Sequence, residues 1–175
     1  MAIDREIIYE RVRYEAAVVA LREEAKDVRE VGLNNRGPQI DKFKLRAHSP
    51  LSANHQWCGF FVFYCLSEAA NVYSVPLPFI PEKLWSGYKL TKWAKEHPEH
   101  VVTEGPYMPG DFYVIHENGH IGLITSQGPG NIVNTVDGNQ SVVGGGRSLK
   151  QRQRCTLDMR VILRIAPPEE GYVTY

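Results

Sequence analysis

The chain has 175 residues, of which 43% are hydrophobic and 23% charged, and its 20 Lys and Arg balance its 20 Asp and Glu. This size and composition are typical of one globular domain with a substantial core. Zero net charge gives no support to nucleic-acid or membrane-surface binding, and no apolar run approaches the roughly 20 residues of a membrane span. We therefore expect no nucleic-acid partner and no membrane insertion.

The first half of the chain is predicted to be helical. Apolar residues recur at three- and four-residue spacing from 3 to about 31, which predicts an amphipathic helix, in one or two pieces, that stops at Gly32. A short helix is predicted over 39–46. The segment Phe60–Asn71 is apolar on nearly every side, which predicts a buried central helix. After three prolines, a further helix is expected around 82–96.

From Gly110 onward the apolar period changes to that of strands. Strands are predicted over residues 111–116, 120–126, 131–136 and 158–166. The first two form a predicted hairpin through "ENG", in which Gly119 supplies a positive φ. The polar, Gly-rich segment 142–154 ("VVGGGRSLKQRQR") is predicted to be an excursion from the sheet, with "RSLKQRQR" as a solvated surface.

Together these elements predict a single α+β domain over 1–175, with N-terminal helices packed on an antiparallel β-sheet. Within it we distinguish an N-terminal helical segment (1–31), a core (32–139), and a loop with the final strand (140–175). No internal repeat and no linker divides the chain.

Cys58 lies in "NHQWCGFFVFYC", where a loop gives way to the apolar segment. A helix that begins near Trp57 places its sulfur beside unpaired backbone N–H groups and the positive end of the helix dipole, and both favour the thiolate. Considered alone, a cysteine before a buried helix is more often a small core hydrophobe. A nucleophile also needs a base, usually histidine, and a third group that orients the imidazole.

The predicted strands supply those two groups. His120 opens the strand "HIGLI" and shares a face with Gly122, and the next strand ends in "VDGN", which carries Asp137 and Asn139. A cysteine at a helix start, a histidine on a strand and an Asp or Asn on the neighbouring strand form a papain-like arrangement. The sequence leaves open whether Asp137 or Asn139 orients the imidazole.

The remaining candidates favour structural roles. Cys65 lies seven residues beyond Cys58 in the apolar helix, about 10 Å away and too far for a disulfide, and Cys155 opens no helix. The other histidines lack ligand-like spacing, so we predict no metal and no cofactor. The absence of a C-x-x-C motif and of a secretory signal in "MAIDREIIYERVRYEAA" predicts synthesis in a reducing cytoplasm.

Four motifs in this order, W-C, P-G-D-F, N-G-H-I-G-L-I and D-G-N, resemble those of CHAP (cysteine, histidine-dependent amidohydrolase/peptidase) domains. These are relatives of the NlpC-like cell-wall peptidases in the papain-like group. The resemblance covers 32–139, and the order Cys58, His120, Asp137, Asn139 agrees with it. One departure is that the family usually carries Glu or Asn at the orienting position, where this chain has Asp137.

The resemblance implies a papain-like fold and a cysteine-dependent peptidoglycan hydrolase. Such an enzyme is either an N-acetylmuramoyl-L-alanine amidase or an endopeptidase that cuts the stem peptide or its cross-bridge. It implies Cys58 as nucleophile and His120 as proton carrier. Gln56 and Trp57 are the expected substrate-binding residues, and Gln56 with the Cys58 backbone N–H the expected oxyanion donors.

An enzyme made in the cytoplasm reaches the wall of a target cell by one of two routes. It is either a phage endolysin, or an antibacterial toxin injected into the periplasm as a type VI secretion effector, with an immunity protein that blocks the Cys58 cleft. Two alternatives remain open: a deamidase or other cysteine hydrolase toxin that acts on a non-wall protein, and a non-catalytic binding module with a vestigial triad.

Overall fold

The computed structural model describes residues 4–32, 35–52, 55–79, 86–115, 119–142 and 145–168. Its helices are α1 (Arg5–Glu24), α2 (Pro38–Arg46), α3 (Cys58–Tyr73) and α5 (Gly87–Glu96). Its strands are β1 (Phe112–Ile115), β2 (Ile121–Gln127), β3 (Ile132–Ser141), β4 (Arg147–Cys155) and β5 (Met159–Leu163). None of the described helices is both long and apolar enough to cross a membrane.

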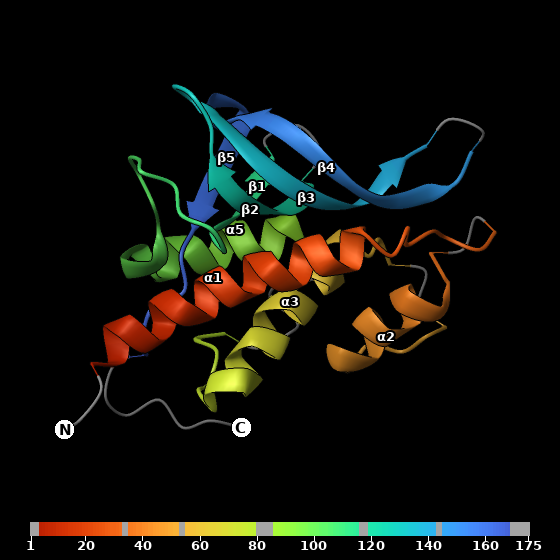
Figure 1. Cartoon of the computed structure of the whole chain (residues 1–175), viewed down its shortest axis with the longest axis horizontal. Helices are drawn as coiled ribbons and strands as arrows, with labels where there is room; N and C mark the ends of the chain where they lie inside the picture. Colours follow the sequence, from red (N-terminus) through yellow and green to blue (C-terminus); the bar gives the residue numbers. More distant parts are fainter. Residues whose placement is uncertain are drawn as a thin grey trace.

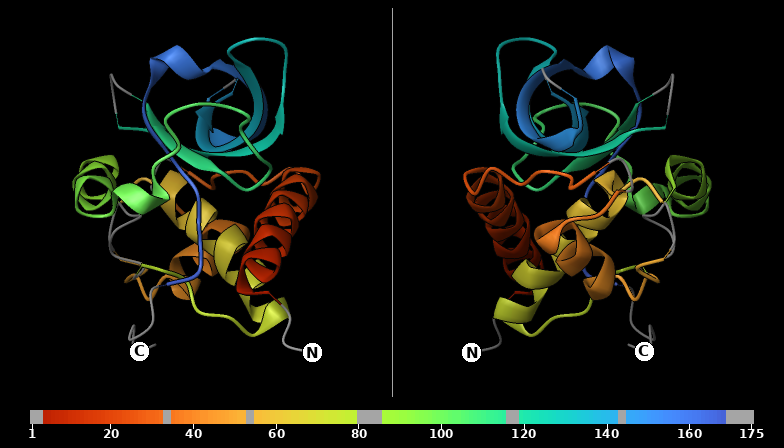
Figure 2. Two further views of the ribbon diagram at one scale, coloured as in Figure 1. Left: turned by 90° about the vertical axis from the view of Figure 1, so that its left-hand side faces the viewer. Right: turned by 90° about the vertical axis from the view of Figure 1, so that its right-hand side faces the viewer.

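The five strands form one antiparallel sheet in the order β4-β3-β2-β1-β5. The sheet lies over α1 and α3 (Figure 1), and its β3–β4 end curls strongly when the molecule is viewed along the sheet (Figure 2). The main apolar core lies between the helices and the sheet, and a smaller cluster that includes Tyr113 and Ile124 packs on the opposite side. The predicted α+β class with an antiparallel sheet is confirmed.

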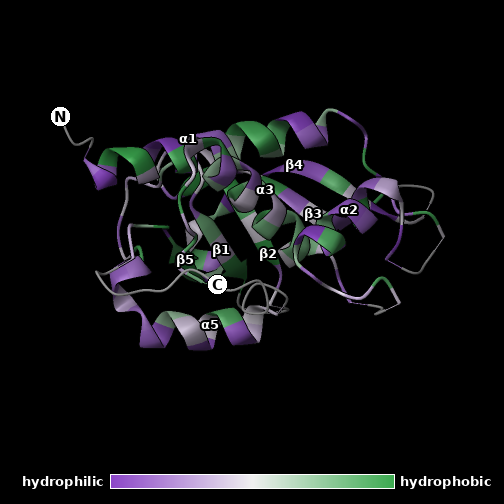
Figure 3. Cartoon of the chain, turned by 90° about the horizontal axis from the view of Figure 1, so that it is seen from below, coloured by the Kyte–Doolittle hydropathy of each residue, from purple (hydrophilic) through white to green (hydrophobic). Residues whose placement is uncertain are grey.

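Helix α1 starts where the Asp4 side chain accepts a hydrogen bond from the Glu6 backbone N–H (3.0 Å). Hydrophobic and hydrophilic residues alternate along it (Figure 3), and its buried face packs on α3. The helix ends at Glu24, so the predicted extension to 31 is wrong. Asp27 has a positive φ of 53°, which breaks the helix, and Val28 instead bonds through its carbonyl to Leu149 of β4 (3.2 Å).

Helix α3 is buried along most of its length, as expected for 60–71, and it begins at Cys58. Its first intrahelical bond runs from Phe61 N–H to the Trp57 carbonyl (3.0 Å). The helix ends at Tyr73, and Ser74 caps it in a left-handed conformation (φ 54°). This start places the Cys58 sulfur at the N-terminus of a helix in contact with β2 and β3.

The hairpin prediction is confirmed in its described parts. β1 pairs with β2, Ile115 N–H donates to the His120 carbonyl (2.9 Å), and Gly119 has a φ of 66°. Residues 116–118 lie outside the described residues. So do 82–85, the first part of the predicted helix at 82–96 that α5 otherwise represents.

The prediction that 142–154 leaves the sheet is wrong for its larger part. β4 pairs with β3 from Ile132 opposite Cys155 to Ser141 opposite Arg147. The strand is an edge of the sheet, and edge strands commonly carry charged residues that discourage further pairing. Because the strand is so polar, its sequence shows no apolar alternation from which a strand could be predicted. β3 also continues past 136 to Ser141, and its register with β4 shifts between Asp137 and Gln140.

Candidate active site

The thiol of Cys58 lies at the first residue of α3, where the helix leaves backbone N–H groups without intrahelical partners. The residue is 4% exposed. Burial alone would raise the pKa of the thiol, but a hydrogen bond and charge from His120 outweigh it, aided by the backbone N–H groups of Ile121 and Gly59. The net result is a pKa below the ordinary thiol value, which favours the thiolate.

The imidazole of His120 follows the Gly119 turn and lies directly before β2. Burial disfavours its charged form, yet hydrogen bonds to Asp137 and Cys58 raise the pKa of His120 to about 9. Its Nε2 atom lies 3.8 Å from Asp137 Oδ2 and 3.2 Å from Gln140 Nε2. Because Nε2 faces Asp137 and Gln140, Nδ1 is the ring nitrogen left to bond to the Cys58 sulfur.

The carboxylate of Asp137 is completely buried on β3 and bonded on both oxygens. The Tyr113 hydroxyl donates to Oδ1, and Arg154 donates to Oδ2 through Nε (2.8 Å) and through Nη2. Burial raises the pKa of Asp137, but His120, Arg154 and Tyr113 lower it by more. Burial and the Asp137 charge raise the pKa of Tyr113, which keeps that hydroxyl a donor.

Two glycines make these close approaches sterically possible. A Cβ on Gly122 would overlap both the Tyr113 hydroxyl and the Asp137 carboxylate. A Cβ on Gly138 would lie 2.9 Å from Trp57 Cζ3 and 3.2 Å from Cys58 Cα, closer than ordinary contacts. Glycine at both positions therefore lets β3 approach the start of α3 and lets the polar groups meet.

The structure brings Cys58, His120 and Asp137 together, and no hydrogen bond or ion pair joins the Asn139 side chain to them. Asn139 has a positive φ of 59° at the irregularity in β3, and its Oδ1 has no partner within the described part of the chain. Of the two candidates that the sequence left open, Asp137 is the one beside the imidazole. Gln56 is exposed and lines a pocket next to Asn139.

Trp57 does not lie where substrate contact requires it. The side chain is 0% exposed, and its ring packs near Phe43 (6.3 Å between centroids) and against Gly138. The expectation that Trp57 lines a substrate groove is corrected accordingly: the ring anchors the start of α3 in the core.

Three further residues of this network were not found from the sequence: Tyr113, Gln140 and Arg154. Tyr113 could have been inferred, because the predicted hairpin places it opposite Gly122. Arg154 lies in the run that was expected to be solvated, yet it bonds to buried Asp137 and to Gln140 Oε1 (3.4 Å). Gln140 in turn lies against His120 Nε2 (3.2 Å).

The arrangement has the parts of a nucleophilic site. A thiol at a helix N-terminus is hydrogen-bonded to an imidazole, and the imidazole faces a buried, ionised carboxylate. Such a group can activate a thiol, carry its proton and hold the ring in one orientation. Among the described residues, no three His, Cys, Asp or Glu side chains are placed to hold a metal ion.

Alkylation by iodoacetamide should distinguish the two cysteines of α3. We expect the rate for Cys58 to reach half its maximum at a pH below the ordinary thiol pKa of 9.0, because His120 stabilises the thiolate. Cys65 should stay unlabelled in the folded protein, because burial raises its pKa well above that value. Peptide mapping by mass spectrometry across a pH series measures both. A Cys58 midpoint at or above 9.0 would contradict the thiolate assignment.

No protein-family model matches the chain, and no curated protein is significantly similar to it in sequence.

Proposed function

We propose that this chain is a cysteine-dependent hydrolase of the papain-like, CHAP type, and that it cleaves amide bonds of peptidoglycan. The observation that carries the proposal is the Cys58 thiol, bonded to an imidazole that faces buried Asp137. The three groups come in order from the start of a helix, from a hairpin and from the strand next to that hairpin. This order also supports a papain-like arrangement.

The chemistry proceeds in two steps. The Cys58 thiolate attacks the amide carbon and forms a C–S bond, and His120 donates a proton to the amine as the C–N bond breaks. Water then attacks the thioester while His120 accepts a proton from it, the C–S bond breaks, and the acid is released with the thiolate–imidazolium pair restored. Asp137 holds the ring and stabilises the imidazolium in both steps.

The developing oxyanion needs hydrogen-bond donors. The backbone N–H of Cys58 lies in the first turn of α3, where it has no intrahelical acceptor. Gln56, exposed and two residues earlier, is the proposed second donor. Both act from the helix end at which the dipole favours negative charge.

The resemblance of the motifs around Cys58, His120 and Asp137 to those of CHAP domains supports peptidoglycan as the proposed substrate. The bond cut is the N-acetylmuramoyl-L-alanine amide or a peptide bond of the stem or cross-bridge. The proposed setting is the periplasm or wall of a target cell, reached as an injected effector or as a phage endolysin. In the effector case, an immunity protein would cover the Cys58 site.

Purified sacculi provide the direct test. Wild-type protein should release soluble muropeptides, and mass spectrometry of their new ends identifies the bond. Protein alkylated at Cys58 should release none, because the sulfur can no longer attack. Sacculi left intact by wild-type protein, or digested equally by the alkylated protein, would rule out the proposed function.

A further inference from the structure

A pocket of about 370 Å³ lies beside the candidate nucleophile. Gln56, two residues before Cys58, forms part of its lining, and so does Asn139, which follows the glycine that packs on Cys58 Cα. Glu30 and Arg147 also line it. The pocket therefore lies next to the same two features that surround the Cys58 thiol: the residues at the start of α3 and the irregularity in β3.

Asn139 contributes a buried polar atom that lacks a partner. The residue is 9% exposed, and its Oδ1 accepts no hydrogen bond from the residues that the structure describes. This oxygen is closed to solvent, so Asn139 forms part of the pocket wall and does not bind a ligand through Oδ1.

Glu30 and Arg147 bring opposite charges to the same pocket without pairing. Their backbones are joined by a hydrogen bond from Glu30 N–H to the Arg147 carbonyl (2.8 Å), but no ion pair links the two described side chains. The Glu30 carboxylate accepts from the Asn35 backbone N–H, and Arg147 Nη1 donates to Ser141 Oγ (2.7 Å). Each side chain therefore retains hydrogen-bonding capacity for a ligand.

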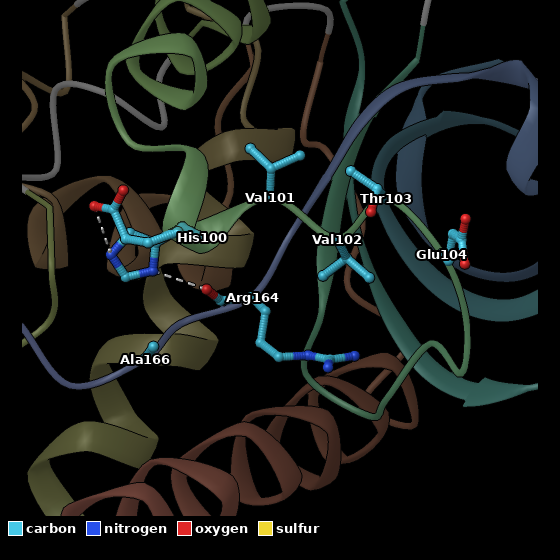
Figure 4. A pocket seen from close by; sticks show the side chains of 8 residues that line it. His100, Val101, Val102, Thr103, Glu104, Arg164 and Ala166 are labelled. Carbon is cyan, nitrogen blue, oxygen red and sulfur yellow. Dashed lines mark hydrogen bonds and ion pairs between the residues drawn. The ribbon is translucent and has the colours of Figure 1, made fainter.

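A second pocket, of about 280 Å³, lacks these features (Figure 4). His100 Nδ1 lies 3.0 Å from the Arg164 carbonyl, and the Arg164 guanidinium bonds to Asp111 (2.7 and 2.8 Å) and to the Pro106 carbonyl (3.0 Å). Its main polar groups are thus occupied within the protein, which points to a structural role.

We propose that the pocket lined by Asn139, Glu30 and Arg147 is a substrate subsite for a peptide residue that carries both a free ammonium and a free carboxylate. Arg147 binds the carboxylate, and the Glu30 carboxylate accepts the N–H donors of the ammonium. A carboxylate and a guanidinium that do not pair with each other favour such a zwitterionic group over a neutral sugar, because sugar hydroxyls carry no charge for either to bind. The inference rests on the proposed function, because it identifies what the hydrolase recognises next to the bond it cuts.

Binding can be measured without hydrolysis. Cys58→Ala protein is titrated calorimetrically with muropeptides that a muramidase releases from sacculi. Adding Arg147→Gln should weaken binding by about tenfold or more, because one charge-assisted hydrogen bond to the ligand carboxylate is lost. Amidation of the peptide carboxylates should weaken binding to the Arg147 protein similarly and leave the Arg147→Gln protein unaffected. Acetylation of the peptide amines should likewise weaken binding to the Cys58→Ala protein and leave binding to the Cys58→Ala, Glu30→Gln protein unaffected.

Arg152→Gln is the matched control, because it removes the same charge from an exposed position of the same strand outside this pocket. Its affinity should equal that of the Cys58→Ala parent. Equal affinities of the Arg147→Gln and Arg152→Gln proteins would overturn the subsite, even where wild-type protein digests sacculi. Sacculi that wild-type protein leaves intact would instead overturn the hydrolase proposal, whatever the titrations show.

Discussion

Replacing Cys58 with alanine is expected to lower kcat/KM for muropeptide cleavage by about 10⁶-fold, the scale of loss when a triad loses its nucleophile. Alanine offers no electron pair to the amide carbon, so no thioester can form. The fold should persist, because alanine suits a helix and the substitution removes a buried ionisable group. Release of muropeptides measures the loss, and circular dichroism with thermal unfolding checks the fold.

Cys65→Ala is the control for this variant. It makes the same chemical change in the same helix at a residue with no exposed surface. We expect it to reduce the free energy of unfolding by about 1 kcal/mol while kcat/KM stays within a few-fold of wild type. Retained activity in Cys58→Ala, or an equal loss in both variants, would show that the sulfur of Cys58 is not the nucleophile.

The placement of Cys58 and His120 could be predicted because local signals fix both. A loop followed by an apolar run locates the start of α3, and "ENG" with Gly119 locates the turn before His120. Neither inference needs knowledge of which distant segments pair. Each depends only on backbone preferences within a few residues.

The choice between Asp137 and Asn139 could not be made from the sequence, because the period-two rule assumes a regular strand. In a regular strand, residues two apart share a face, and both side chains would be equally able to reach His120. The register shift between Asp137 and Gln140, with the positive φ of Asn139, breaks that alternation. Asp137 therefore faces the imidazole while Asn139 lines the neighbouring pocket.

Arg154 was missed for a different reason. Its partner Asp137 lies 17 residues away, and only the pairing of β4 with β3 brings the two side chains together. A run such as "RSLKQRQR" gives no apolar pattern from which that pairing can be inferred. Through this pairing, the Arg154 guanidinium neutralises the orienting carboxylate and also contacts Gln140. Gln140 in turn lies against His120.

Replacing Asp137 with asparagine is expected to lower kcat by about 10⁴-fold, the loss seen when the orienting aspartate of a triad becomes an amide. The amide is nearly the same size but carries no charge to stabilise the His120 imidazolium. Arg154, half-buried and bonded to this carboxylate, also loses its counterion, so the free energy of unfolding should fall by about 3 kcal/mol. Assays must therefore be run below the unfolding temperature of the variant.

The pH profile separates lost orientation from lost stability. In wild type, activity should decline as His120 loses its proton at a pKa of about 9, because the imidazolium protonates the leaving amine. Asp137 contributes a hydrogen bond that raises this pKa, so Asp137→Asn should shift the alkaline limb to lower pH. A variant that is only destabilised has lower activity at every pH, but the pH at which its activity declines on the alkaline side does not change. Asn139→Ala should raise KM and leave the limb near 9; if it moves the limb and Asp137→Asn does not, Asn139 is the residue that orients His120.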